Sequence, residues 1–212
     1  MQTKSLLIVG LVLVATAVKS NALSINFDSV NAQSGHVDAT AYLAALGVTL
    51  SGSNPVYVTD DRWFYSGGAV AASSPHNFLL QDVGGSPNGI SYTLNFSTAL
   101  ASLSFTRIAI TAPSSVAQWT ATAYVGSTAV SSVGESFFSG TEGAQTYTLT
   151  GSGITSLTIT ANGFNFAGIS SAPLDDFIGA EVPETGSTFG LLLPSVLALL
   201  GAVQLRSLRQ RK

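Results

Sequence analysis

The chain has 212 residues, no cysteine and few charged side chains, and its formal net charge of −3 hides an uneven distribution. All eleven acidic residues lie between positions 23 and 184, where Arg62 and Arg107 are the only basic residues, so this stretch carries a net charge of −9. Such a surface repels phosphate, which excludes nucleic acid as a partner. The lack of cysteine excludes thiolate metal sites and cysteine nucleophiles.

The first 22 residues have the pattern of a secretory signal peptide. Lys4 precedes a 13-residue apolar stretch at 6–18, and the small residues Ser20 and Ala22 follow it. A basic start, an apolar centre of this length and small residues at the −3 and −1 positions predict cleavage after Ala22. We therefore expect residues 23–181 to form one extracytoplasmic domain.

Alternation of apolar and polar residues predicts strands over most of this domain. It is clearest at residues 90–96. Residues 39–46 suggest one helical turn, and Gly151-Ser152-Gly153 suggests a hairpin between strands 145–150 and 154–161. Further strands are expected at 24–28, 48–51, 56–58, 63–65, 77–81, 103–110, 118–125 and 174–178. The expected fold class is all-β, an antiparallel β-sandwich of jelly-roll type.

The residues that catalysis commonly uses do not form a known sequence pattern. His36 and His76 are best interpreted as loop histidines, since no Gly-x-Ser-x-Gly turn or His-Glu-x-x-His motif accompanies them. Glu135 and Glu142 could in principle form a glycosidase pair, but their Ser/Gly-rich surroundings favour solvated loop acids. We predict that the protein is not an enzyme.

Two pairs of neighbouring acids, Asp60-Asp61 and Asp175-Asp176, are candidates for binding chemistry. The segment around Asp175 resembles the closing strand of carbohydrate-binding jelly rolls, where an aspartate often helps to hold a structural calcium, and residues 25–28 are similar to the opening strand. First and last strands are commonly neighbours in such folds. This resemblance makes Asp28, Asp175 and Asp176 candidate calcium ligands, and solvated or capping aspartates are the alternative.

An aromatic run follows the first acidic pair. Trp63 and Tyr65 would suit stacking on sugar rings if they are exposed, which makes them candidate ligand-binding residues. In a strand, Trp63 and Tyr65 would share one face and Phe64 would lie on the other. At least part of the run would then belong to the core, which is the alternative interpretation.

The C-terminus has the properties of a membrane anchor. Residues 185–205 form an uncharged stretch of 21 residues, which as a helix would cover roughly 30 Å, the thickness of a bilayer core. We predict a transmembrane helix at 189–205. The basic tail at 206–212 should stay cytoplasmic, which places the domain outside. Its stop signal is formed by Arg206, Arg209, Arg211 and Lys212.

A short Pro-Glu motif at 182–188, an apolar helix and an Arg-rich tail together resemble the PEP-CTERM class of bacterial sorting signals. The motif itself is Val182, Pro183, Glu184, Thr185 and Gly186. Because Thr185 replaces the usual second proline, the motif is more similar to the VPDSG-like variant of that class. The resemblance implies processing by an exosortase-like membrane enzyme in a Gram-negative bacterium. The motif at 182–186 also resembles the Leu-Pro-x-Thr-Gly signal of sortases. The alternative is therefore a surface protein that a sortase anchors to the cell wall.

The function expected from these features is that of an exported surface or extracellular-matrix protein. The PEP-CTERM resemblance implies association with exopolysaccharide or biofilm, and weak carbohydrate binding would fit this setting. The partners expected are the processing enzyme, membrane lipid during transit and extracellular polysaccharide. The alternative function is a secreted hydrolase that acts on polysaccharide.

Overall fold

The computed structural model describes residues 22–64, 70–72, 75–81, 90–110, 115–161 and 172–182, all within one compact unit, Ser20–Val182. Fourteen strands and two short helices are found in these ranges, which confirms the all-β fold class. The helices are α1 (Thr40–Ala45) and α2 (Asp61–Phe64). The strands are β1 (Leu23–Ile25), β2 (Val37–Asp38), β3 (Val48–Gly52), β4 (Val56–Asp60), β5 (Val70–Ala71), β6 (Asn77–Gln81), β7 (Ile90–Arg107), β8 (Ala109–Ile110), β9 (Ser115–Val116), β10 (Trp119–Val125), β11 (Thr128–Glu135), β12 (Phe138–Ser139), β13 (Gln145–Ala161) and β14 (Leu174–Glu181).

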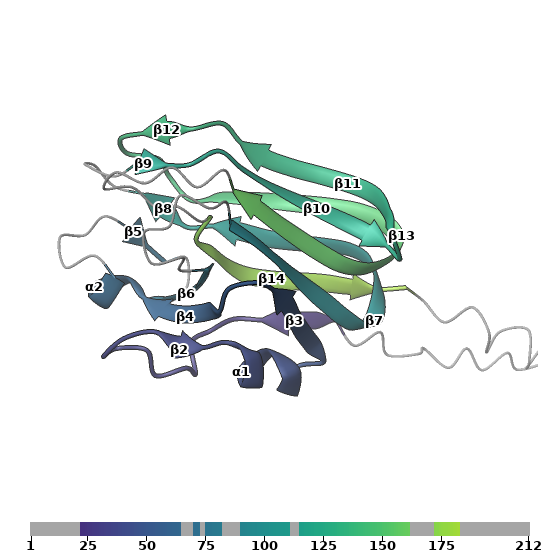
Figure 1. The fold of residues 1–212 in the computed structure, drawn as a ribbon, viewed down its shortest axis with the longest axis horizontal. Coiled ribbons are helices and arrows are strands. Elements are labelled where there is room, and N and C mark those ends of the chain that lie inside the picture. Colours follow the sequence, from purple (N-terminus) through teal and green to yellow (C-terminus); the bar gives the residue numbers. More distant parts are fainter. Residues whose placement is uncertain are drawn as a thin grey trace, which may run out of the picture. The chain divides into compact units, whose positions relative to one another are not determined.

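Most strands belong to one antiparallel sheet with the order β11-β10-β13-β7-β14-β6-β4-β2, in which β1 also pairs with β14 and β3 with β7. The long strand β7 pairs with β13 along one side (Figure 1). On its other side, its first half pairs with β3 and its second half with β14. The β7–β13 pair therefore connects two groups of strands, one with β3, β10 and β11 and the other with β1, β2, β4, β6 and β14.

Both groups of strands contribute to a single hydrophobic core. Phe105 on β7 contacts rings from both groups, with its ring centroid 6.4 Å from that of Trp119 on β10 and 5.7 Å from that of Phe177 on β14. Phe177 in turn makes an edge contact with Phe27, at 6.4 Å. These rings are almost completely buried.

Three predictions about elements are wrong. The strands expected separately at 90–96 and 103–110 belong largely to one strand, β7. Residues 145–161 do not form a hairpin but one strand, β13, whose pairing with β7 shifts register between Thr150 and Ile154. Gly153 adopts a φ of 95°, so the Gly-Ser-Gly segment bends the strand without reversing it. Residues 61–64 form the short helix α2 instead of the expected strand at 63–65, so the alternation argument does not apply to Trp63.

The predicted terminal signals lie almost entirely outside the described residues. This holds for residues 1–21 of the signal peptide, motif residues Pro183 to Gly186, the helix at 189–205 and the basic tail. Val182 is described, and its backbone N–H donates a hydrogen bond to Ala99 O at 3.1 Å. Within the described ranges, no helix is long and apolar enough to cross a membrane.

Candidate ligand-binding site

A polar hollow of about 340 Å³ lies where the end of β4, the start of β6 and the segment after β1 meet. Its wall combines hydrogen-bond donors and acceptors within a small space. The polar residues that line it are the acids Asp28 and Asp60, the amides Asn31, Gln33 and Asn77, the bases Arg62 and His76, and Ser29. Such a mixture can hydrogen-bond a polar ligand from several sides.

Asp60 fixes the guanidinium group of Arg62 at this hollow. The Asp60 side chain is only 2% exposed, and its Oδ1 accepts hydrogen bonds from Arg62 N at 2.8 Å and Nε at 2.9 Å. Its Oδ2 accepts from Arg62 Nη2 at 2.6 Å. The hydrogen bonds from Arg62 lower the pKa of Asp60, so its carboxylate is charged near neutral pH. Arg62 is thereby held in one orientation although half of its side chain is exposed.

Asp61 holds His76 in a similar way. The Asp61 Oδ1 and His76 Nδ1 atoms are 2.9 Å apart, and Asp61 Oδ2 accepts a hydrogen bond from Ala72 N at 3.1 Å. The backbone N–H of Asp61 also donates to His76 O at 2.7 Å. His76 has a φ of 85°, a left-handed conformation that costs a non-glycine residue about 1–2 kcal/mol. The neighbouring acids Asp60 and Asp61 thus place two basic side chains around one hollow.

Asn77 carries an unsatisfied polar atom at this site. The residue is 4% exposed, and its Nδ2 donates hydrogen bonds to Phe27 O at 2.8 Å and Val30 O at 2.7 Å. Its Oδ1 is buried and has no hydrogen-bond partner among the described residues. An unsatisfied buried acceptor costs roughly 1–3 kcal/mol. Because this atom is sealed from solvent, it offers no contact to a ligand in the hollow.

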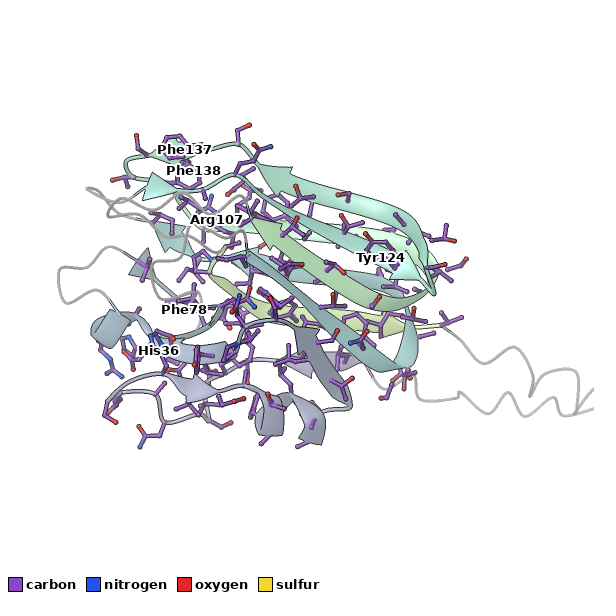
Figure 2. The ribbon with its side chains drawn as sticks, viewed as in Figure 1. His36, Phe78, Arg107, Tyr124, Phe137 and Phe138 are labelled. Atoms are coloured by element: carbon purple, nitrogen blue, oxygen red, sulfur yellow. The ribbon has the colours of Figure 1, made fainter. Side chains whose placement is uncertain are left out.

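A second polar cluster, around Glu135, is fully bonded within the protein. Glu135 accepts hydrogen bonds from Arg107 Nε and Nη2, from Trp119 Nε1 at 2.8 Å and from Tyr147 Oη at 2.6 Å. Burial opposes ionisation of Glu135, but these hydrogen bonds outweigh it and lower the pKa of the carboxyl. Arg107 Cζ also lies 5.3 Å from the centre of the Phe138 ring (Figure 2).

The Glu135 cluster is therefore a structural element that joins β7, β10, β11 and β13. The expectation that Glu135 is a solvated loop acid is wrong, because the residue ends strand β11 and its side chain is 15% exposed. Glu142 is exposed, as expected.

The predicted calcium ligands occupy different environments. Asp28 is exposed and lines the polar hollow together with Asp60. Asp175 is buried in β14, where its Oδ1 accepts a hydrogen bond from Asp176 N at 2.8 Å. Among the residues that the structure describes, no group of three or more His, Asp or Glu side chains is arranged to hold a metal ion. A calcium site at these aspartates stays a prediction.

The other predicted ligand-binding residues cannot be placed. Tyr65 and the side chain of Trp63 lie outside the described residues. The sequence did single out Asp60-Asp61, the pair that organises the hollow. It carried no signal for Asn77, because the importance of that amide depends on its burial beside Phe27 and Val30.

No family model and no curated protein matches the chain. Solved structures of cyclases are similar to it at low identity. One is the Stig cyclase Fisc from Fischerella sp. TAU, crystallised with (3Z)-3-(1-methyl-2-pyrrolidinylidene)-3H-indole, at 11% identity and a TM-score of 0.44, covering 76% of this chain and 99% of that one. A cyclase from Fischerella sp. TAU is 10% identical, with a TM-score of 0.45, and the match covers 76% of this chain and 98% of the cyclase. An apo form of a cyclase from Fischerella sp. is 11% identical, with a TM-score of 0.45, and the match covers 77% of this chain and 98% of the cyclase.

These neighbours contradict the prediction that the protein is not an enzyme, because all three are cyclases. We withdraw that prediction.

Proposed function

We propose that the chain is an exported protein of the bacterial cell surface or extracellular matrix, whose β domain binds polysaccharide. The signal-peptide pattern at 1–22 supports export, and the pattern at 182–212 supports transient anchoring followed by processing by an exosortase-like enzyme. In this location, outside the cell, the polymers available to a polar site are largely carbohydrates.

The polar hollow is the observation that carries the binding part of the proposal. Carbohydrate hydroxyls both donate and accept hydrogen bonds, and they are recognised by fixed carboxylates, amides and guanidinium groups. The hollow offers these three groups, with Arg62 held rigidly by Asp60. Ordered groups lose little conformational entropy when a ligand binds.

The proposal includes a finer description of the fold. We propose that the two groups of strands connected by β7 and β13 face each other as the sheets of a β-sandwich of jelly-roll type. The single core shared by both groups supports this arrangement. Strands that bend can contribute to both sheets of such a sandwich.

Binding to the exopolysaccharide of the producing bacterium tests the proposed function. The full chain in detergent is incubated with the purified polymer, and co-sedimentation is measured with calcium and again with EDTA. We expect the protein to sediment with the polymer. Loss of binding in EDTA would support the calcium hypothesis. Failure to sediment with polymer under both conditions would contradict the proposed function.

A polysaccharide-acting hydrolase is the second candidate, because two carboxylates, Asp28 and Asp60, line the same hollow. Two carboxyl groups on either side of a glycosidic bond are the usual catalytic arrangement of such enzymes. This alternative predicts that the unmodified chain releases reducing ends from the exopolysaccharide and that Asp28→Asn does not. Binding without release of reducing ends would exclude it for that polymer.

A further inference from the structure

We infer that removal of the signal peptide creates an ion pair between the new α-amino group of Leu23 and the carboxylate of Glu181, which fastens β1 to β14. This inference rests on the proposed function, because it requires export and cleavage after Ala22. It goes beyond that function by assigning the cut end of the chain a binding site in the folded domain.

Cleavage changes the chemistry at the start of β1. In the uncut chain, the nitrogen of Leu23 belongs to a neutral peptide bond with Ala22. Hydrolysis breaks this bond: a water molecule gives its hydroxyl to the Ala22 carbonyl carbon and a proton to the Leu23 nitrogen. The amine then takes a second proton from the new carboxyl group. Because an α-amino group ordinarily titrates at about pH 7.7–8.0, the cut end carries a positive charge in neutral solution.

Leu23 and Glu181 lie on the same face of the β1–β14 pair. The two strands are antiparallel, with Leu23 opposite Gly179, and a Cβ atom at Gly179 would lie 3.1 Å from Leu23 Cβ. Along β14, Gly179 is buried, Ala180 is exposed and Glu181 is half-buried, as expected when alternate side chains share a face. Glu181 is therefore the diagonal neighbour of Leu23, a separation that a long side chain can bridge.

The direction of the strands brings the amine nearer still to this carboxylate. In an antiparallel pair, the nitrogen of Leu23 lies at the end of the residue that points along β14 toward Glu181. The position of Glu181 is itself fixed, because it pairs with Leu100 of β7. The next residue, Val182, donates its backbone N–H to Ala99 O at 3.1 Å.

Leu23 and Glu181 also line one hollow, of about 270 Å³. Among the described residues that line it, Glu181 is the only one with an ionisable side chain. The segments that pack around it, 46–48 and 96–100, contribute apolar residues, glycine, serine and threonine. No second charged side chain of this lining therefore competes for the amine.

The charge balance of the domain favours the pair. Residues 23–184 contain eleven acidic and two basic residues, and both bases, Arg62 and Arg107, are already paired with Asp60 and Glu135. The α-amino group is a third cation, formed in a region of excess negative charge. Glu181 is the carboxylate closest to it along the paired strands.

Acetylation of the amine in the processed protein from the extracellular fraction tests the inference. Lys4, Lys19 and Lys212 are the only lysines and lie in the removed segments, so acetic anhydride acetylates only the α-amino group among the amines. We expect acetylation to raise the equilibrium constant of unfolding about two- to fivefold at about pH 6, the size typical of a partly exposed ion pair. At about pH 10, where the amine is neutral, acetylation should have no effect. Urea unfolding followed by tryptophan fluorescence measures both.

Glu181→Gln should abolish the effect of acetylation at the lower pH, because the amine then has no carboxylate to pair with. Glu142→Gln is the matched control, since Glu142 is an exposed acid that does not line this hollow. Acetylation should still destabilise the control two- to fivefold. An equal effect of acetylation on Glu181→Gln and on the unmodified protein, or no effect on the unmodified protein at the lower pH, would overturn the inference.

N-terminal sequencing of the same sample separates this inference from the proposed function. If the exported protein begins at Leu23 but acetylation leaves its stability unchanged, export stands and the ion pair is wrong. The same holds if it begins at another residue after 22. If the protein is not exported and retains residues 1–22, both are wrong.

Discussion

Glu135 and Arg107 form the most deeply buried ion pair that the structure describes, with side chains 15% and 3% exposed. Glu135→Ala would leave the Arg107 guanidinium buried without its counter-charge. Removal of one partner from such a pair typically costs about 3–5 kcal/mol. We expect a loss of that size in the free energy of unfolding, measured by urea denaturation followed by tryptophan fluorescence.

Glu142→Ala is the control for this prediction, because Glu142 is an exposed acid seven residues away whose backbone, not its side chain, pairs with Ile110. We expect a change within about 0.5 kcal/mol. Similar losses in the two variants would contradict the structural role assigned to Glu135.

The lowered pKa of Glu135 predicts how this stabilisation depends on pH. A carboxyl group with a lower pKa in the folded than in the unfolded state stabilises the fold above the unfolded pKa, here near 4.5. The contribution is lost as pH falls through the folded pKa. The difference in unfolding free energy between the unmodified chain and Glu135→Gln should therefore shrink below pH 4.5 in urea titrations. A difference that grows on acidification would contradict the assignment.

Two tyrosines, one buried and one half-buried, have hydroxyl groups in opposite environments. The Tyr92 hydroxyl is buried without a partner among the described residues, whereas the Tyr147 hydroxyl donates to Glu135 at 2.6 Å. Tyr92→Phe removes an unsatisfied group and should leave stability unchanged or raise it by up to about 1 kcal/mol. Tyr147→Phe should lower it by about 1–3 kcal/mol, since it removes a hydrogen bond to a charged group. Urea unfolding measures both changes in stability. A larger loss in Tyr92→Phe than in Tyr147→Phe would contradict these two environments.

At the scale of elements, alternation in the sequence predicted the strands that have one buried face. Strands β3, β10 and β14 lie close to their expected ranges, and so does β6, although all five of its residues are buried. Helix α1 also lies within the predicted segment 39–46, and Gly47 follows it with a φ of 75°. These elements are specified locally, by side-chain periodicity and by a glycine that suits a left-handed conformation.

The errors occur where a neighbouring strand, not the local sequence, decides the structure. Strand β13 continues through Gly151-Ser152-Gly153 because both of its halves pair with β7. Strand β11 is a Ser/Gly-rich edge strand that contains no buried residue, so it has no clear hydrophobic alternation. Neither pairing can be read from a local window.

Strand β11 gives a prediction at this scale. A Cβ atom at Gly134 would lie 2.3 Å from Trp119 O, so Gly134→Ala must push β11 away from β10. We expect a loss at the upper end of the roughly 1–3 kcal/mol typical of overpacking, with weaker contacts at Glu135. Gly126 lies in the β10–β11 turn, and a Cβ atom added there has no other atom within 4 Å. Gly126→Ala therefore costs only the strain of placing an alanine at a φ of 58°, about 1 kcal/mol. Thermal unfolding should rank Gly134→Ala as the less stable variant, and the reverse order would contradict the β10–β11 register.

At the scale of the whole molecule, export and membrane anchoring stay predictions, and the sequence also singled out part of the candidate site. Asp60-Asp61 stood out as a rare acidic pair, and Trp63 and Tyr65 drew attention to the same region. The contribution of the segment after β1 could not be predicted, since Asp28 and Asn77 are 49 positions apart and meet only through folding. The calcium hypothesis rests on a resemblance to the first and last strands of carbohydrate-binding jelly rolls, which does not determine where carboxylate oxygens point.

Export of the β domain, with removal of both terminal signals, is the central claim at this scale. Intact-mass spectrometry of the protein recovered from the extracellular fraction of its native host tests it directly. The expected mass is that of a chain that begins at Leu23 and has lost about the last 27 residues. Recovery of the protein only from the cytosol, with residues 1–22 and the basic tail from Arg206 to Lys212 intact, would contradict it.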